Sequence, residues 1–385
     1  MGSGGNAQSP TPEATSPKGK AKSPTPAPAS PVQAKSPTPG PGSPGTAAPG
    51  LLPGAHWADV GLPEENPEND WDSALGSDVE SSTASITSSI LKYRTINGRT
   101  YHSDSVTDGE YWGPNDQKQN EVLDIFHHMV TIYLDGELYE APITKNPENI
   151  LDVGTGTGLW AIDMADKFPS CNVIGTDISP IQPSWVPPNV SFVIEDAGKE
   201  WTFQDNHFDF IHFRWLPGCM KDWTAVYKQA YRCLKPGGWI EHMDSSGDVI
   251  SEDGSVPEDS ALKQWGRIWQ EAGRRMGNPV DTLPTNLQEI GMKEAGFVNL
   301  TKKEHPIPAS PWPSDKKAKE IGLYFYMVWA SDLEGICQYI FSNVMGWEKE
   351  AISTYIAHLR AELRDTTMHG LFQFRTVYAQ KPLDA

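Results

Sequence analysis

The sequence contains little cysteine and no long apolar segment. Only four of its 385 residues are cysteines, and none stands in a CxxC or other metal-type spacing. This argues against a disulfide scaffold or a metal site and is typical of reduced thiols. No apolar run reaches the roughly 20 residues of a membrane-spanning helix, and the N-terminus MGSGGNAQSPTPEATSPKGK lacks the apolar centre of a secretory signal. We therefore expect an intracellular protein, cytoplasmic or nuclear, that is not secreted and has no transmembrane segment.

Basic residues are also scarce. The chain has 31 lysines and arginines against 50 aspartates and glutamates, which gives a formal net charge of −19. Affinity for nucleic acid comes largely from lysine and arginine neutralising phosphates. The charge balance therefore argues against direct nucleic-acid binding and favours a small molecule or a protein as the partner.

The N-terminal leader has the composition of an unfolded chain. Residues 1–50 hold twelve prolines and almost no large apolar residue, and residues 51–90 carry eight acids and no base. Such segments cannot bury enough apolar surface to offset the entropy of ordering, so we expect disorder over residues 1–85. Ser-Pro recurs at six to seven residue intervals, which fits either an array of proline-directed phosphorylation sites or a plain linker. The six serines are Ser9, Ser16, Ser23, Ser30, Ser36 and Ser43.

The rest of the chain predicts one α/β domain preceded by a helical lead-in. Within the lead-in, residues 86–145, apolar residues of 122–134 recur with the period of a buried helix. Over residues 146–385, strands and helices alternate, which predicts a Rossmann-like α/β fold with a seven-stranded, mostly parallel sheet and helices on both faces. We expect a helical insertion at about 316–364, before the last strand. The predicted strands are Asn149–Val153, Asn172–Thr176, Val190–Ile194, Phe208–Phe213, Trp239–Met243, Val298–Glu304 and Phe372–Ala379.

The strongest motif is the glycine-rich segment NILDVGTGTG, residues 149–158. An apolar strand leads into glycines and then into an amphipathic helix, which is the context of a nucleotide-type cofactor site. Leu159 stands where the dinucleotide pattern GxGxxG requires glycine. The spacing is instead GxGxG, which favours a cofactor without pyrophosphate, although another Rossmann-type site or a plain tight turn would also fit.

Two acids follow the next two predicted strands. Asp177 comes about twenty residues after the glycines, where its carboxylate can accept both hydroxyls of a ribose. Asp196 ends the third strand, where it can accept an adenine amino group beside the Ala197 N–H. The alternative for Asp177 is an ordinary exposed acid, and for Asp196 a helix N-cap.

Several segments together resemble a known family. LDVGTGTG, GTDIS, EDAG, FDFIHFR and LKPGGWIEHMD are similar to class I methyltransferases, and residues 99–143 resemble the fungal LaeA-like, or TAM-domain (UMTA-type), methyltransferases. The resemblance covers roughly residues 70–385. It implies S-adenosylmethionine as cofactor and a link to fungal secondary metabolism. The binding residues that it supports are Asp152, Gly154, Thr155, Gly156, Gly158, Asp177, Ile178, Asp196 and Ala197.

The same family resemblance leaves two functions open. One is an enzyme that methylates a small molecule or a protein. The other is a nuclear regulator of secondary metabolism and development that works through velvet-type protein partners, with methyl transfer secondary. The Ser-Pro leader favours the second, because disordered segments can be switched by phosphorylation.

Methyl transfer from a sulfonium needs positioning more than a nucleophile. If the acceptor is a hydroxyl, a base would help, and we consider the histidines at positions 127, 128, 212 and 242. The candidates retained are His128 and His212, with Arg214 as a residue that could orient the acceptor, although a structural role fits each of them as well.

Tryptophan is abundant, with 14 residues. Five of them fall in segments expected to border the cleft, where they predict an aromatic acceptor pocket; a role in the core is the alternative. These five are Trp185, Trp201, Trp215, Trp312 and Trp329.

Overall fold

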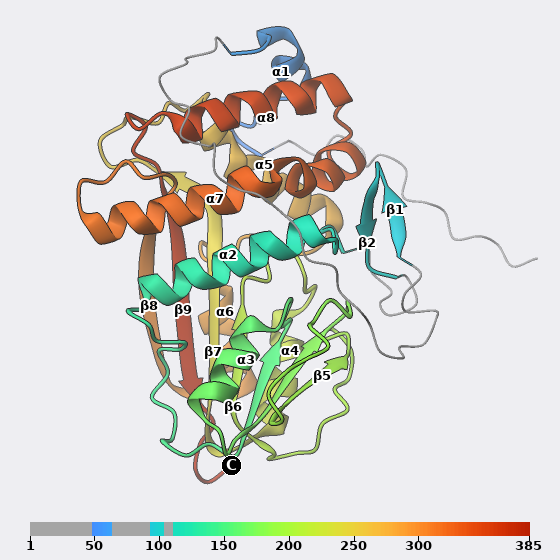
Figure 1. Cartoon of the computed structure of the whole chain (residues 1–385), viewed down its shortest axis with the longest axis vertical. Helices are drawn as coiled ribbons and strands as arrows, with labels where there is room; N and C mark the ends of the chain where they lie inside the picture. Colours follow the sequence, from blue (N-terminus) through green and yellow to red (C-terminus); the bar gives the residue numbers. More distant parts are fainter. Residues whose placement is uncertain (1–47, 64–92, 104–110) are drawn as a thin grey trace, which may run out of the picture. The chain divides into compact units, whose positions relative to one another are not determined.

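The computed structural model describes residues 48–63, 93–103 and 111–385. Their centre is a seven-stranded sheet in the order β5-β4-β3-β6-β7-β9-β8 (Figure 1). The first five strands of this order are parallel, whereas β9 runs antiparallel to β7 and β8. The predicted mostly parallel α/β sheet is confirmed. The strands are β3 (Asn149–Val153), β4 (Asn172–Asp177), β5 (Val190–Ile194), β6 (Phe208–Arg214), β7 (Leu234–Ile250), β8 (Val298–Pro308) and β9 (Leu371–Gln380).

The register of the central strands brings their carboxyl ends level. Val153 at the end of β3 pairs with Thr176 of β4 on one side and with Phe213 of β6 on the other. Side chains that follow these positions therefore gather at one edge of the sheet, which is where parallel α/β folds bind ligands. β3 itself is buried at four of its five residues, as expected for a strand that has neighbours on both sides and helices on both faces.

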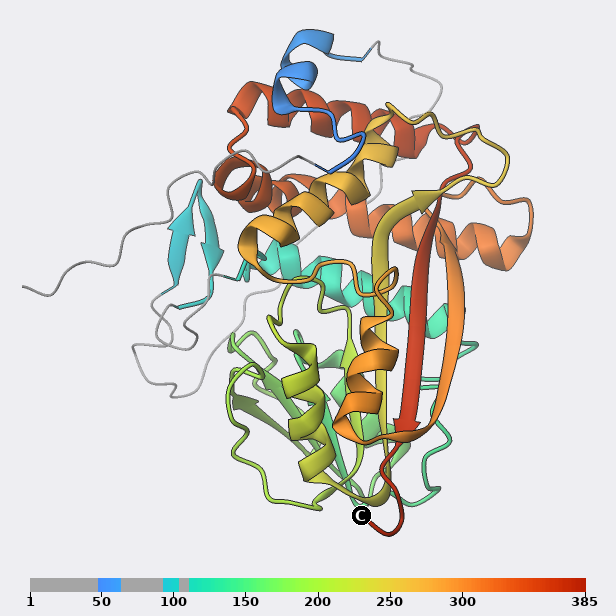
Figure 2. The ribbon, with the colours of Figure 1, turned by 180° about the vertical axis from the view of Figure 1, so that it is seen from behind.

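Helices cover both faces of the sheet. α2 and α3 lie over one face (Figure 1) and α4 and α6 over the other (Figure 2). α2 is longer than the predicted segment and begins at Gln117, because Asp116 caps it by accepting the Gln119 N–H. No helix within the described ranges combines the length and apolar character needed to span a bilayer. The four helices are α2 (Gln117–Tyr133), α3 (Leu159–Lys167), α4 (Trp223–Cys233) and α6 (Leu287–Ala295).

Strand β7 is much longer than its predicted five residues. It continues beyond Met243 through the polar segment Asp244–Asp248 and pairs with β9 as far as Ile250. The ladder shifts register between Ser245 and Val249, as a β-bulge does. Polar residues hid this extension from the sequence pattern, yet it carries β7 past the sheet edge and up to the helices above it.

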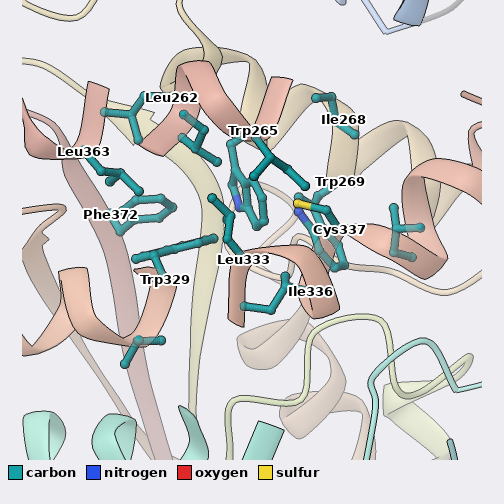
Figure 3. Close-up of a cluster of buried hydrophobic side chains, with 14 of the residues drawn as sticks. Leu262, Trp265, Ile268, Trp269, Trp329, Leu333, Ile336, Cys337, Leu363 and Phe372 are labelled. Atoms are coloured by element: carbon teal, nitrogen blue, oxygen red, sulfur yellow. The ribbon is translucent and has the colours of Figure 1, made fainter. Parts of the chain in front are cut away.

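A second group of helices lies above the carboxyl edge of the sheet. α5 (Ala261–Met276) follows β7, and the segment between β8 and β9 contains α7 (Lys316–Tyr339), the π-helix η2 (Ile340–Val344) and α8 (Lys349–Arg364). The predicted helical insertion before the last strand is confirmed. These helices bury a common apolar cluster, in which Trp265 and Trp269 of α5 lie close to Trp329 and Leu333 of α7 (Figure 3).

Part of the expected leader is ordered. Residues 54–60 form the short helix α1 (Gly54–Val60), although composition predicted disorder through residue 85. The reason is Trp57, an isolated large apolar side chain that is buried against Tyr355 of α8 with ring centroids 4.9 Å apart. The Ser-Pro array lies outside the described residues.

A buried ion pair holds the hairpin of β1 (Arg94–Ile96) and β2 (Arg99–Tyr101) to the helices. Arg99 Nη1 and Nη2 donate to the two carboxylate oxygens of Asp332 at 2.7 and 2.6 Å, and Nη2 also donates to Asp116 at 2.6 Å. Asp332 is fully buried at a kink of α7, where its φ of −147° and ψ of 44° are not helical. Arg99 therefore supplies the charge that makes this buried carboxylate tolerable.

We expect Arg99→Ala to lower the free energy of unfolding by about 3 kcal/mol, because removing one partner leaves an uncompensated buried charge. Lys118 lies 3.5 Å from Asp332, but it is exposed and compensates only in part. The more exposed pair Arg360–Glu334 is the control, and Arg360→Ala should cost less than about 1 kcal/mol. Urea unfolding of both variants measures the difference; equal losses would contradict this account.

Candidate active site

The glycine turn joins β3 to α3 through three residues with positive φ. Gly154, Gly156 and Gly158 have φ values of 70°, 59° and 84°, which L side chains rarely adopt. A Cβ at Gly154 would stand 2.5 Å from Leu216 Cδ2, and one at Gly158 would stand 2.3 Å from Phe192 Cζ. These two glycines are required for close packing. Gly156 meets only Leu123, at 3.2 Å, so its missing side chain keeps open space beside the turn.

Asp177 fixes the turn from the end of β4. Its Oδ2 accepts the Gly156 N–H at 2.8 Å and its Oδ1 accepts the Ser179 N–H at 2.9 Å. Each carboxylate oxygen can accept a second hydrogen bond. Burial raises the pKa of Asp177 to about 6, against the lowering effect of these backbone donors. Sequence reasoning missed Gln182, which donates from Nε2 to the Gly156 carbonyl at 2.7 Å.

Asp196 follows β5 in a tight turn. It stands two residues beyond the end of the strand at Ile194, a small correction to the prediction that it ends the strand. Its Oδ1 accepts the Gly198 N–H at 2.9 Å, and the residues that follow form a turn instead of a helix. The N-cap alternative is therefore wrong. The next residue, Ala197, is buried.

A cavity of about 360 Å³ lies beside this turn, and we call it the glycine-turn cavity. Most of the predicted cofactor residues line it, from three separate strand ends. The predicted residues that line it are Gly154, Gly156, Asp177, Ile178, Asp196 and Ala197. Gly158 does not line it; this residue is the N-cap of α3.

A smaller cavity of about 50 Å³ adjoins the turn on its other side, and we call it the arginine cavity. The predicted residues Asp152, Thr155, His212 and Arg214 line it. His212 Nδ1 and Asp152 Oδ1 are 2.8 Å apart, and the imidazole stacks on Trp160 at 3.8 Å. Burial lowers the pKa of His212 to about 4. His212 is therefore neutral near pH 7 and too weakly basic to serve as a strong general base.

The structure separates the two adjacent histidines of α2. His128, the candidate retained from the sequence, is exposed and packs against Tyr324, so it lines none of the cavities described for this site. His127 faces inward and lines the arginine cavity. The prediction of His128 is wrong because successive helical residues point about 100° apart, and the sequence alone did not say which of the two faces the sheet.

A third cavity of about 80 Å³ lies between the sheet and the upper helices. We call it the aromatic cavity, since nine of its seventeen lining residues are aromatic and none of the seventeen is charged. The aromatic residues come from five separate parts of the chain. They are Tyr111, Trp112, Trp215, Trp265, Trp269, Phe325, Trp329, Phe372 and Phe374.

Two of the five predicted tryptophans line the aromatic cavity and three do not. Trp215 and Trp329 line the aromatic cavity. Trp185 is 86% exposed. Trp201 is buried and its indole N–H donates to the Ala197 carbonyl. Trp312 stacks on His369. Sequence reasoning also missed Trp265 and Trp269, although their spacing of four residues places them on one face of a helix.

Trp215 occupies the junction of the three cavities, since it lines all of them. Its φ of 54° is strained for a bulky residue. The indole stacks on Phe126 with centroids 3.9 Å apart, and its backbone N–H donates to the Met243 carbonyl at 2.9 Å. These contacts hold the strained conformation and fix the indole where the cavities meet.

Comparison with known proteins agrees with this geometry. The family model described as "Methyltransferase domain" matches residues 125–302. "Methyltransferase pytC" of Aspergillus terreus is 38% identical over 307 residues, 79% of this chain and 93% of that protein. "Probable methyltransferase tdiE" of Emericella nidulans is 34% identical, and the match covers 69% of this chain and 82% of that protein. "Secondary metabolism regulator LAE1" of Cochliobolus heterostrophus is 32% identical, and the match covers 74% of this chain and 94% of that protein.

These relatives match the chain over 82 to 94% of their own lengths. Together with the sheet order, this similarity shows that the chain belongs to the fungal LaeA-like family of class I, S-adenosylmethionine-dependent methyltransferases.

Proposed function

We propose that the chain transfers the methyl group of S-adenosylmethionine to a small, uncharged acceptor whose flat apolar ring lies in the aromatic cavity. One observation carries the proposal: Trp215, Tyr111 and Gln119 line both the aromatic cavity and the glycine-turn cavity. Ligands in the two cavities would lie side by side. Methyl transfer requires such proximity, with water excluded from between donor and acceptor.

The residues of the glycine-turn cavity fit the cofactor. Asp177 has oxygen lone pairs left for hydroxyl donors after its two backbone bonds, and Asp196 can accept from an amino group. The absence of a Cβ at Gly156 leaves room for a ligand against the backbone. We therefore assign cofactor binding to the nine residues predicted from the sequence, with Gly158 acting through the packing of the turn.

When bound, S-adenosylmethionine supplies an electrophilic methyl group. The chain's own residues contribute positioning and exclusion of water. Trp215 is held rigidly by Phe126 at the junction of the cavities, and the apolar walls of the aromatic cavity keep water from the acceptor. The neutral His212 holds Asp152 and, through it, the glycine turn. Asp152 also accepts the Thr155 hydroxyl at 2.6 Å.

The walls of the aromatic cavity favour a particular class of acceptor. None of the residues that line it is charged, so a charged ring substituent would be buried without a partner, which is costly. Three lining residues contain a buried polar atom without a hydrogen-bond partner: Gln119 Oε1, Trp269 Nε1 and Trp329 Nε1. Buried polar groups normally have partners. An acceptor with a neutral hydroxyl or carbonyl oxygen on its ring would supply them.

We expect cofactor affinity to depend on pH through Asp177. Hydroxyl groups donate best to the ionised carboxylate, and its pKa is raised to about 6. Affinity is therefore full above this value and falls as the pH drops through 6, by about tenfold at pH 5. Calorimetric titration from pH 8 to pH 5 measures it. Asp177→Asn should bind more weakly and lose this dependence; an unchanged pH profile in Asp177→Asn would contradict the assignment.

The proposal is tested by following a labelled methyl group. The full chain is incubated with methyl-labelled S-adenosylmethionine and either a small-molecule extract or a protein extract of a filamentous fungus. We expect label in an organic-soluble product that absorbs as an aromatic ring, and none with Gly156→Arg. Label found in neither fraction, with the cofactor bound, would contradict the proposed transfer.

The regulatory function is the second candidate. It is favoured by the relative named a secondary metabolism regulator, LAE1, at 32% identity, and by the Ser-Pro leader. In this case the chain would act in the nucleus through velvet-type partners, and the net charge of −19 favours contacts with protein over contacts with nucleic acid. Label transferred only to protein would favour this candidate over the metabolite enzyme.

A further inference from the structure

The candidates for a catalytic base that the sequence suggested do not reach the aromatic cavity. His128, His212 and Arg214 are absent from its lining, and the residues that do line it carry no charge. Arg214 is therefore not in the position that its predicted role of orienting an acceptor requires. A hydroxyl group attacks better as it loses its proton, so a base that stands behind the cavity wall would assist transfer to an oxygen.

Ser246 forms a polar part of that wall. It is buried in the bulged segment of β7 and lines the aromatic cavity. Its Oγ donates to Asp281 Oδ2 at 3.1 Å and accepts the Asp248 N–H at 3.1 Å. A serine oxygen has two lone pairs, so these two contacts leave one of them for a hydroxyl group in the cavity.

Asp281 stands behind Ser246 and does not line the aromatic cavity itself. Its Oδ2 also accepts from Gln270 Nε2 of α5 at 2.9 Å, and its Oδ1 accepts the Leu283 N–H at 3.3 Å. These bonds fix the carboxylate against the serine hydroxyl. Asp281 is only half-buried, so a proton that it takes can pass on to solvent.

The electrostatic surroundings of Asp281 make it a stronger base than an ordinary aspartate. Burial raises the pKa of Asp281 to about 6 and the negative charge of Asp248 adds to this, whereas its hydrogen-bond donors lower it. From β9, Arg375 reaches the same loop, but it donates to the Leu283 carbonyl and pairs with Glu304. The carboxylate is therefore ionised at neutral pH, with a pKa close enough to take up a proton there.

The loop that carries Asp281 passes both larger cavities. Asn278 lines the glycine-turn cavity and Val280 lines the aromatic cavity. On the other side, β7 contributes the Met243 carbonyl that accepts the N–H of Trp215, the residue at the junction. A hydroxyl group beside Ser246 is therefore on the part of the aromatic cavity that faces the cofactor, as methyl transfer requires.

We propose that the methyl acceptor is a neutral ring hydroxyl and that Ser246 and Asp281 relay its proton. This deepens the proposed function and rests on it. The hydroxyl oxygen forms a C–O bond with the methyl carbon as the C–S bond breaks, and the C–S electron pair stays on sulfur. The hydroxyl proton passes to Ser246 Oγ while the serine's own proton passes to Asp281 Oδ2. A sulfonium and a carboxylate become a neutral sulfide and a carboxylic acid, so charge is conserved.

The test follows label transfer as a function of pH. The full chain receives a small-molecule extract of a filamentous fungus and methyl-labelled S-adenosylmethionine, kept saturating at every pH so that the titration of Asp177 does not limit the rate. The product is treated with boron tribromide, which cleaves aryl methyl ethers. We expect this treatment to release the label, and the initial rate to fall about tenfold from pH 7 to pH 5 as Asp281 is protonated.

Three variants identify the relay. Asp281→Asn keeps an oxygen for Gln270 and Ser246 but cannot take the proton, so the rate should fall about 100-fold and no longer decrease from pH 7 to pH 5. Ser246→Ala removes the catalytic hydroxyl and should lower the rate by a similar factor. Asp248→Asn removes the charge that helps to raise the pKa of Asp281, so the decrease in rate should move to lower pH.

Glu362→Gln is the matched control. Burial raises the pKa of Glu362 to about 7, so it titrates in the same range. However, it accepts the N–H groups of Ala261 and Leu262 at the start of α5 and lines none of the three cavities. It should keep both the rate and the pH profile. In every variant, cofactor affinity within about threefold of the unmodified protein shows that the chain is folded.

The outcomes separate this inference from the proposed function. Full transfer by Ser246→Ala or by Asp281→Asn overturns the relay. So does a slow Asp281→Asn that keeps the original pH profile, because its role is then structural. Label that boron tribromide does not release is not in an ether, which overturns the inference while the proposed methyl transfer stands. If the unmodified protein transfers no label, the proposed function fails and the inference fails with it.

Discussion

Gly156→Arg is expected to abolish measurable binding of S-adenosylmethionine, weakening it by at least about 100-fold. The new side chain has only one protein neighbour near its Cβ, Leu123 at 3.2 Å, and Gly156 lines the glycine-turn cavity. The guanidinium must therefore occupy space that the proposal gives to the ligand. It would also bring a positive charge close to a sulfonium. Calorimetry or equilibrium dialysis measures the loss.

Gly136→Arg is the matched control. Gly136 also has a positive φ, 88°, and no atom lies within 4 Å of the site of its Cβ. It carries the same backbone strain, of order 1 kcal/mol, in a turn that lines none of the three cavities. We expect its affinity to stay within about threefold of the unmodified protein. Cofactor binding by Gly156→Arg at normal affinity would refute the location of the site.

The sheet and the glycine-turn side of the site could be predicted because their signals are local. An apolar parallel strand is recognisable within five residues, as at Asn149–Val153. In parallel sheets the acids that follow consecutive strands must meet at one edge, so Asp177 and Asp196 could be placed beside Gly156 without any knowledge of contacts. The strand ends were the least certain part: β7 runs seven residues beyond its predicted end at Met243.

The abundance of tryptophan predicted an aromatic pocket, but most of the residues that line the aromatic cavity could not be predicted, because nothing local marks them. Tyr111 precedes α2, Trp269 belongs to α5, Trp329 to α7 and Phe374 to β9. Their meeting depends on how the upper helices pack, which composition and periodicity do not determine. The same limit explains the choice of His128 over His127, and it hid the pairing of Arg214 with His127, 87 residues apart. Sequence patterns placed the glycine turn and the acids that follow the strands, whereas tertiary packing decided the acceptor side.

Val328→Trp is expected to abolish transfer of the methyl group to an organic-soluble acceptor, by at least about 100-fold, while cofactor affinity stays within about threefold. Val328 is buried on α7 and lines the aromatic cavity of about 80 Å³, but not the glycine-turn cavity. An indole in place of the isopropyl group would fill much of this space and exclude a ring. Overpacking should cost about 1–3 kcal/mol of stability.

Val344→Trp is the control for that cost. Val344 of η2 packs against the same apolar cluster but lines none of the three cavities, so it should lose stability without losing transfer. Normal transfer by Val328→Trp would place the acceptor outside the aromatic cavity. Loss of transfer in both variants, each with the cofactor bound, would instead attribute the effect to the packing of the upper helices. Loss of transfer in Val328→Trp alone, with a comparable loss of stability in Val344→Trp, places the acceptor in the space beside α7.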